Sequence, residues 1–159
     1  MLSTKLKEYL ERENIRYSII NHSTAYTAEE VAESADIPAT EMAKTVIVNI
    51  EGTQVMVVLP AQDQIDFELL ESVLDTRNVS LVSEKEFMPR FSECETGAMP
   101  PFGNLYNMDV IVEETLSHDE MIAFNAGSHN ELVELAYDDF NDLVHPRVMR
   151  ISTQYLSAF

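Results

Sequence analysis

The stretch that decides the fold is Lys44-Thr-Val-Ile-Val-Asn-Ile50, followed by Glu51-Gly52 and then by Gln54-Val-Met-Val-Val-Leu59. β-Branched residues dominate both runs, and such residues favour extended strands. The Glu-Gly pair between them supplies a tight turn, so we predict a β-hairpin. The hairpin places an antiparallel pair of strands in the first half of the chain.

Helix signals lie on both sides of this hairpin. Thr27-Ala-Glu-Glu30 has the spacing of a capping box, in which a hydroxyl and a carboxylate satisfy free backbone amides at a helix start. Ser83-Glu-Lys-Glu86 repeats this spacing. The predicted helices run from Ser3 to about Asn14, from Thr27 to about Ala35, from Asp66 to Leu74, from Ser83 to about Pro89, and from Asp138 or Asp139 to Val144.

Further short strands complete the pattern. We predict them at Arg16 to Ile20, Val79 to Val82, Asp109 to Glu113, Met121 to Asn125 and Leu132 to Ala136. Strands outnumber helices and do not alternate steadily with them, which argues against a doubly wound parallel sheet. We therefore expect an α/β fold with a barrel-like, mixed and largely antiparallel sheet surrounded by helices. A length of 159 residues indicates one domain, 1–159, with a C-terminal tail at 145–159.

The formal net charge is -18, with only ten Lys and Arg residues. Such a surface repels polyanions at long range, and nonspecific affinity for phosphates depends on Lys and Arg. A DNA partner is therefore not expected. A protein that grips only the end of a nucleic acid needs few phosphate contacts, so that class stays open. The charge is equally explained as a surface for solubility or salt adaptation.

Cys94 is the single cysteine, so the chain has no internal disulfide, which fits a reducing compartment. The N-terminus has no signal-like apolar run, and no segment is long enough to span a bilayer. We expect a cytoplasmic protein without a membrane partner.

Conventional catalytic motifs are missing from the sequence. It contains neither a G-x-S-x-G elbow nor an H-E-x-x-H pair nor a phosphate-binding loop. Glu93 and Glu95 flank Cys94 and would raise the pKa of its thiol, which disfavours a nucleophilic role. The four histidines lack metal-ligand spacing. We predict neither a metal nor an organic cofactor.

Three features remain as candidates for chemistry. Lys44 stands at the mouth of an apolar strand, where a lysine is either a solubilising charge or a cation at a pocket rim. In the loop Thr96–Gly103, two glycines and two adjacent prolines make a stiff segment that either aims backbone N–H groups at an oxyanion or forms a structural turn. Phe124–His129 is a strand that ends in small residues, which admit a ligand or simply form a turn.

Together and in this order, the segments of the chain resemble the YbaK family of aminoacyl-tRNA deacylases, which includes the editing insertion of bacterial prolyl-tRNA synthetases. The matching pieces are His22 with Thr27-Ala-Glu-Glu-Val-Ala, Ala43-Lys-Thr-Val-Ile-Val48, Gly97-Ala-Met-Pro-Pro-Phe-Gly103, Val112-Glu-Glu-Thr-Leu116 and Phe124-Asn-Ala-Gly-Ser-His129. They cover about residues 1–144. The Gly-Ala-x-Pro-Pro-Phe-Gly loop is the most specific of them.

The resemblance implies a hydrolase that removes a small amino acid, such as alanine or cysteine, from the transfer RNA for proline. Lys44 matches the essential lysine of the family, and Gly97 and Ala98 match the loop that faces the scissile carbonyl. The implied partners are the 3′ end of an aminoacyl-tRNA and, as an open alternative, a synthetase. The implied substrate-binding residues are His22, Thr45, Phe102, Gly103, Asn125, Gly127, Ser128, His129 and Asp139.

The residues leave two other functions open. One is a non-catalytic module that binds an aminoacyl group or a synthetase. The other is an esterase acting on a small aminoacyl metabolite, which the acidic surface would suit. An aminoacyl ester is already activated, so a deacylase needs no nucleophilic side chain if backbone donors stabilise the oxyanion.

Overall fold

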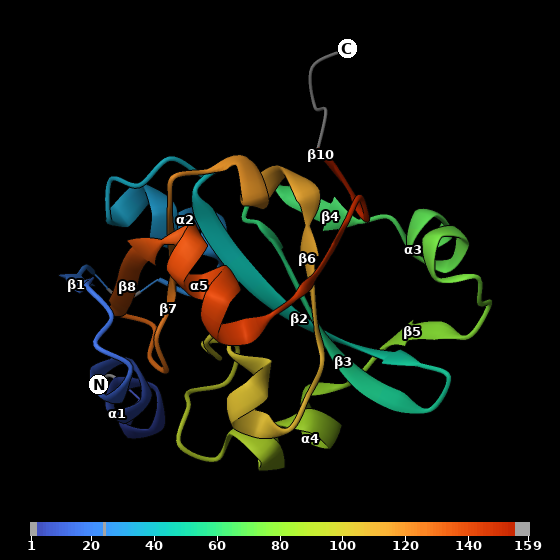
Figure 1. Ribbon diagram of the computed structural model, residues 1–159, viewed down its shortest axis with the longest axis horizontal. Coiled ribbons are helices and arrows are strands. Elements are labelled where there is room, and N and C mark those ends of the chain that lie inside the picture. Colours follow the sequence, from blue (N-terminus) through green and yellow to red (C-terminus); the bar gives the residue numbers. More distant parts are fainter. Residues whose placement is uncertain (1–2, 24, 155–159) are drawn as a thin grey trace.

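The computed structural model describes residues 3–23 and 25–154 (Figure 1). The helices are α1 (Thr4–Arg12), α2 (Ala28–Ser34), α3 (Phe67–Leu74), α4 (Glu84–Phe87) and α5 (Tyr137–Val144), with short 3₁₀ turns η1 (Met88–Phe91), η2 (Gly103–Tyr106) and η3 (Glu114–His118). The strands are β1 (Tyr17–Asn21), β2 (Met42–Ile50), β3 (Thr53–Pro60), β4 (Asp63–Ile65), β5 (Val79–Leu81), β6 (Val110–Glu113), β7 (Met121–Asn125), β8 (Glu131–Ala136), β9 (Arg147–Met149) and β10 (Ser152–Gln154).

Most strands join one mixed sheet in the order β1-β8-β7-β2-β3-β6-β9, with β5 paired to β2. The pairs β2–β7, β3–β6 and β6–β9 are parallel, and the other pairs of this sheet are antiparallel. Strands β4 and β10 form a separate antiparallel pair. The predicted mixed, largely antiparallel sheet with flanking helices is confirmed. Among the described residues its two ends, β1 and β9, stay unpaired with each other, so it does not close into a barrel.

The predicted hairpin crosses the middle of the molecule as β2 and β3 (Figure 1). Its register runs from Ala43 opposite Pro60 to Ile50 opposite Thr53. Glu51 and Gly52 both have positive φ, 50° and 88°, as a type I′ turn requires. This turn matches the twist of the two strands and fixes which residues face each side of the sheet.

Alternation along these strands supplies two buried faces. Ile47, Val58 and Val112 belong to the larger core, which also contains the apolar residues of α1, α4 and α5. Val48 and Val57 belong to a second cluster with α3 and Ile151. The helices therefore cover both sides of the central strands and hold the ends of β2 rigidly.

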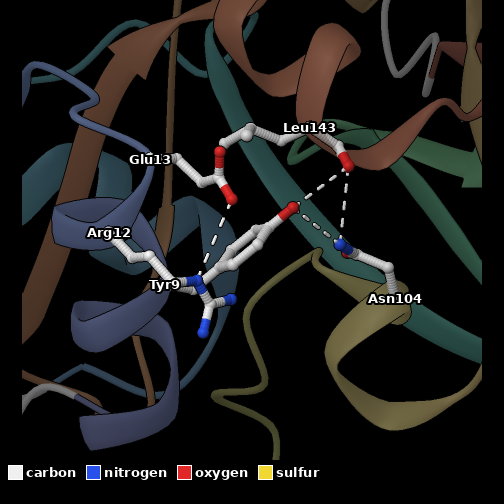
Figure 2. Close-up of polar contacts among 5 residues, drawn as sticks. All are labelled: Tyr9, Arg12, Glu13, Asn104 and Leu143. Carbon is white, nitrogen blue, oxygen red and sulfur yellow. Dashed lines mark hydrogen bonds and ion pairs between the residues drawn. The ribbon is translucent and has the colours of Figure 1, made fainter.

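Polar contacts tie α1 to the end of α5 (Figure 2). The Tyr9 hydroxyl donates to the carbonyl of Leu143 at 3.3 Å, and the Asn104 side-chain amide donates to the Tyr9 hydroxyl at 3.1 Å. An ion pair between Arg12 and Glu13 is long, 3.9 Å, and exposed, so it adds little stability. The N-terminal helix is thus anchored mainly by Tyr9 and by its apolar face.

One predicted helix start is confirmed, and two differ from the prediction. The capping box at Thr27 is present with both of its hydrogen bonds. At Ser83 the hydroxyl makes no cap hydrogen bond to the backbone and instead donates to the Glu86 carboxylate at 3.4 Å, so the second capping box is wrong. The last helix begins after Ala136, which places Asp138 and Asp139 inside its first turn, where their charges favour the positive end of the helix dipole.

The tail predicted at 145–159 packs partly on its own domain. Its described part, 145–154, contributes β9 and β10, and Ile151 is fully buried. Residues 155–159 lie outside the described residues. None of the helices in the described part of the chain has the length and apolar character needed to cross a membrane.

Candidate active site

A small cavity lies at the start of β2, where the sheet meets the segment before α2. Its volume is about 170 Å³. The lining brings together two residues far apart in the sequence, Lys44 and Gly97. The full lining is Tyr26, Ala28, Ala43, Lys44, Thr45, Gly97, Met99 and Asn125.

Lys44 is half-buried between this cavity and a second hollow of about 200 Å³ lined by Thr27, Ala28, Glu29 and Ala61. Burial lowers the pKa of its ammonium group, and the charges of Glu29 and Asp63 oppose that shift. Lys44 lines both hollows, which favours the interpretation as a cation at a pocket rim over that as a purely solubilising charge.

The loop at Gly97 is held by the turn after β7. The Gly127 N–H donates to the Ala98 carbonyl at 2.9 Å, and the Glu95 N–H donates to the Gly127 carbonyl at 2.8 Å. Gly97 has φ +84°, which glycine adopts without strain. The Ala98 N–H is already donated to the Glu95 carbonyl at 3.0 Å. The Gly97 N–H makes no such bond among the described residues, so it is the better placed of the two amides to face a substrate, and the role of Ala98 stays a prediction.

His129 supports this loop from behind. Its Nε2 donates to the Thr96 carbonyl at 2.6 Å, and a Cβ built on Gly97 would lie 3.6 Å from its Cε1. Its ring packs against Tyr26 with centroids 5.0 Å apart. A carbonyl only accepts, so Nε2 carries the proton, and the buried Nδ1 has no hydrogen-bond partner in the described structure. His129 fixes the position of the cavity wall.

Asn125 and Thr45 contribute polar atoms to the cavity lining. Asn125 is the last residue of β7, and its buried Oδ1 has no hydrogen-bond partner among the described residues. Buried polar atoms are normally paired, so an unpaired amide beside a cavity is typical of a site that receives a polar ligand.

Several predicted site residues lie elsewhere and serve the fold. Phe102 is fully buried, with its ring 5.5 Å from those of Phe124 and Phe140. At Gly103 an added Cβ would lie only 2.5 Å from the Met108 carbonyl oxygen, so this glycine permits close packing. Neither residue lines the cavity, because the Pro-Pro segment turns the chain into the core after Met99.

The turn residues Gly127 and Ser128 also lie behind the cavity wall. A Cβ on Gly127, which has φ +108°, would come within 3.1 Å of Ser3. The Ser128 hydroxyl is buried and donates to the Asn130 side chain at 3.0 Å. Both shape the turn that holds the Gly97 loop.

His22 and Asp139 are likewise absent from the cavity lining. The backbone of His22 pairs with Asn130 at 3.0 Å, and its Nδ1 lies 2.7 Å from the carbonyl of Ser23. Asp139 stands on α5, which packs against β8. Neither residue lines the cavity, and their role in substrate binding stays a prediction.

Tyr26, Ala28, Ala43 and Met99 line the cavity but were not predicted. Tyr26 is 71% exposed and immediately precedes the capping box of α2, so an aromatic residue at a helix entrance was the available signal. The other three are small or flexible apolar residues, which carry no sequence signal that separates a cavity wall from a core.

The arrangement offers a backbone donor, a cation and an amide around a small space. Such a set can hold a carbonyl oxygen and an adjacent anionic group. The described residues contain no group of three His, Cys, Asp or Glu side chains placed to hold a metal ion.

Solved structures show the same fold. The hypothetical protein APE2540 superimposes with a TM-score of 0.83 at 20% identity, over 94% of this chain and 99% of that one. A candidate trans-editing enzyme for prolyl tRNA synthetase superimposes with a TM-score of 0.80 at 14% identity, over 95% of this chain and 96% of that one. A comparison with curated proteins finds no match.

Residues 22–143 match the family model of the aminoacyl-tRNA editing domain. This range contains Lys44, the Gly97 loop, Asn125 and His129, and it accounts for most of the chain. The protein belongs to the aminoacyl-tRNA editing domain family, as its resemblance to YbaK-like deacylases indicated.

Proposed function

We propose that this chain is a trans-editing hydrolase that cleaves the ester of a mischarged aminoacyl-tRNA, with alanine or cysteine on the transfer RNA for proline as its substrates. The observation that carries the proposal is that Lys44 and Gly97 line one cavity of about 170 Å³. Membership of the editing-domain family and the candidate trans-editing fold relative support the reaction class.

The size of the cavity favours a small acyl group. Pockets for drug-sized ligands usually measure about 300–1,000 Å³, so this space suits only a short side chain and the ester. One methylene changes binding by only about 1–3 kcal/mol through attraction alone. In the proposal, the side chain of the amino acid packs against the wall formed by Met99 and the Gly97 loop, which His129 holds through the Thr96 carbonyl, so the shape of this wall sets the selectivity.

The reaction needs a stabilised oxyanion and an oriented ester. In the proposal the Gly97 N–H donates to the carbonyl oxygen as negative charge develops there, an effect worth about 2.7–4 kcal/mol per donor. Water attacks the carbonyl carbon, the bond from that carbon to the esterified ribose oxygen breaks, and the amino acid leaves as a carboxylate. The neighbouring ribose hydroxyl takes a proton from the water and passes one to the leaving ribose oxygen. In the proposal, Asn125 holds the amino-acid end of the substrate through its Oδ1, which has no hydrogen-bond partner among the described residues.

Lys44 acts as a fixed positive charge toward the terminal ribose and phosphate. It is not assigned a covalent step, because an aminoacyl ester is already activated and needs no nucleophilic side chain when a backbone donor stabilises the oxyanion. With a net charge of -18, this cation on the cavity rim is a local exception to a repulsive surface. We therefore expect the protein to bind the body of transfer RNA weakly and to use a synthetase as an auxiliary partner. We also expect it to be cytoplasmic.

The test is hydrolysis of alanyl- and cysteinyl-tRNA for proline by the native chain, by Lys44→Ala and by Lys85→Ala. Lys85 is an exposed lysine on α4 and serves as the matched control. We expect Lys44→Ala to lose at least about 100-fold in kcat/KM, the effect of removing one transition-state contact, and Lys85→Ala to retain full activity.

Other outcomes identify the remaining functions. Binding of the aminoacyl-tRNA without hydrolysis by the native chain would indicate a non-catalytic module. Hydrolysis of small aminoacyl esters at equal or higher efficiency than the transfer RNA ester would indicate a metabolite esterase. Equal rates in the native chain and Lys44→Ala would overturn the mechanism.

A further inference from the structure

A larger cleft of about 590 Å³ lies beside the candidate active site. Its volume falls within the usual range of ligand pockets, whereas the acyl cavity is too small for a nucleotide. None of its residues belongs to the predicted site. The cleft is lined by Thr40, Pro60, Gln62, Asp63, Glu113, Thr115, Asp119, Arg150, Ser152 and Thr153.

The chain from Pro60 to Asp63 connects this cleft to Lys44. Pro60 lines the cleft and pairs in the sheet with Ala43, which lines the acyl cavity. The next residue, Ala61, lines the second hollow together with Lys44. Burial lowers the pKa of Lys44, and the charge of Asp63 in the cleft acts against that shift, which shows that the two side chains interact. The three hollows therefore follow one another along the end of β2 and β3.

Two cations stand on this path in an otherwise acidic protein. Lys44 lines the two inner hollows and the exposed Arg150 lines the cleft, and the described linings of the three hollows contain no other Lys or Arg. A chain of phosphates that extends from the acyl cavity would meet Lys44 first and Arg150 next. The guanidinium group contacts a phosphate through paired donors.

Two of the three carboxylates that line the cleft, Glu113 and Asp63, are held by hydrogen bonds from the protein itself, whereas the buried Oδ2 of Asp119 has no hydrogen-bond partner among the described residues. Glu113 accepts hydrogen bonds from the backbone of Thr115, Ile151 and Ser152, at 2.7, 3.0 and 3.1 Å. Asp63 accepts from the Ser152 hydroxyl at 2.7 Å. A carboxylate has room for about four hydrogen bonds, so Asp63 retains acceptor capacity for a donor such as a ribose hydroxyl or an exocyclic amine.

We propose that this cleft binds the nucleotide that precedes the esterified adenosine, a cytidine in the 3′ end of transfer RNA, with its phosphate against Arg150 and its base and ribose beside Thr40, Gln62 and Asp63. The proposal rests on the proposed function and adds to it a second nucleotide subsite. It explains how a strongly acidic chain selects a nucleic-acid end with only two cations.

The experiment compares two esters, alanyl-adenosine and the alanyl trinucleotide cytidyl-cytidyl-adenosine, on four proteins. These are the native chain, Arg150→Ala, the control Arg147→Ala and Thr40→Trp, which fills the cleft. Arg147 is exposed on β9 and lies outside the cleft lining. Arg150 and Thr40 are also exposed, so these substitutions leave the core intact.

We expect the native chain and Arg147→Ala to prefer the trinucleotide through a lower KM. Arg150→Ala should lose about fivefold of that preference, the size of one exposed ion pair, and the native preference should fall with added salt. Thr40→Trp should abolish it, and all four proteins should cleave alanyl-adenosine equally. Equal preference in all four proteins would overturn the subsite.

Binding separates this proposal from the proposed function. The same four proteins are titrated with the unesterified trinucleotide and with adenosine monophosphate. If neither ester is cleaved but Arg150→Ala and Thr40→Trp selectively weaken trinucleotide binding, the subsite stands and the hydrolase assignment fails. If both esters are cleaved without a trinucleotide preference, the hydrolase stands and the subsite fails.

Discussion

The two ends of the β2–β3 hairpin both border a hollow, but the hollows differ in the functional groups that line them. At one end, Lys44 and Gly97 line a cavity of about 170 Å³. At the other end, beyond Ile50, an open groove of about 630 Å³ is lined by Glu51, Glu68, Glu71, Ser72, Asp75, Thr76, Arg77 and Asn78. The smaller space contains a half-buried cation, a positive-φ glycine and an unpaired buried amide, whereas the larger is a solvated rim of side chains.

The comparison indicates that the candidate site is recognised by the functional groups that line it together and not by its volume. The groove at the turn end of the hairpin is lined by Glu51 of the turn and by a single later segment, 68–78. The cavity end joins β2, the Gly97 loop and the end of β7, which the fold alone brings together. The first two predictions below pair a residue near the cavity end with one at the turn end, and the last concerns Lys44 alone.

The largest expected effect comes from a pair of glycines. Gly97 and Gly52 have φ of +84° and +88°, so alanine at either position costs about 1–2 kcal/mol of stability. A Cβ at Gly97 also contacts His129 at 3.6 Å, whereas at Gly52 it meets no atom within 4 Å. The contact with His129 is an ordinary one, so the strain comes from the positive φ. If the backbone relaxes by about 1 Å to relieve it, kcat should fall about 100-fold in Gly97→Ala, whereas the kcat of Gly52→Ala, which lies outside the cavity lining, should not change.

Urea unfolding and single-turnover hydrolysis of alanyl-tRNA measure the two quantities on the same preparations. Similar losses of stability with an activity loss confined to Gly97→Ala support the assignment of the amide. An active Gly97→Ala protein with the stability of Gly52→Ala would remove Gly97 from the mechanism.

The second effect concerns two glutamates and the free energy of unfolding. Glu113 is 1% exposed and accepts three backbone hydrogen bonds, while exposed Glu51 accepts one from the Thr76 hydroxyl at 2.8 Å. We expect Glu113→Gln to cost about 2–3 kcal/mol, because bonds to a buried charge are lost, and Glu51→Gln less than about 1 kcal/mol.

The pH dependence of stability tests the same pair. Burial acts to raise the pKa of Glu113, but hydrogen bonds from Thr115, Ile151 and Ser152 outweigh it and lower the pKa below its ordinary 4.5. The carboxylate therefore stabilises the fold above the unfolded pKa, and this contribution disappears as the pH falls through the lower, folded value. Glu113→Gln should flatten the stability curve below pH ~4.5, a change that equal acid midpoints in both proteins would contradict.

The sequence predicts the local part of the fold and only part of the site. The hairpin and the capping box at Thr27 follow from neighbouring residues, and both are present. Strands β4, β9 and β10 were not predicted: each has three residues, and unlike β5, which is equally short, none of them is a run bounded by clear turn signals. Local signals are sufficient where the contacts are local.

The same limit applies to the site residues. Lys44, Thr45, Gly97 and Asn125 were predicted and line the cavity. Phe102 matches the family motif equally well but is part of the core. A motif residue carries no sign of which way its side chain points, since the turn at the Pro-Pro segment decides that in three dimensions. Tyr26 was missed for the same reason.

The smallest effect is a change of binding with pH at Lys44. Burial lowers the pKa of this lysine below 10.5, and Glu29 and Asp63 limit the shift. We expect the affinity for the unesterified trinucleotide to fall as the pH rises from 8 towards 10 in the native chain. Lys44→Arg should keep its affinity, because a guanidinium remains charged above pH ~12.

Stability should move in the opposite direction over the same pH range, which distinguishes loss of the Lys44 charge from alkaline unfolding. Between the lowered folded pKa and the unfolded pKa, the unfolded chain binds more protons, so the contribution of Lys44 to stability increases with pH. Subtracting the curve of Lys44→Met isolates that contribution from the tyrosines, which also titrate near pH ~10. If the affinity and the Lys44-dependent stability of the native protein fall together, Lys44 is a structural charge held by its neighbours. The cavity would then lose its half-buried cation as a functional group, the feature that distinguishes it from the groove at the turn end.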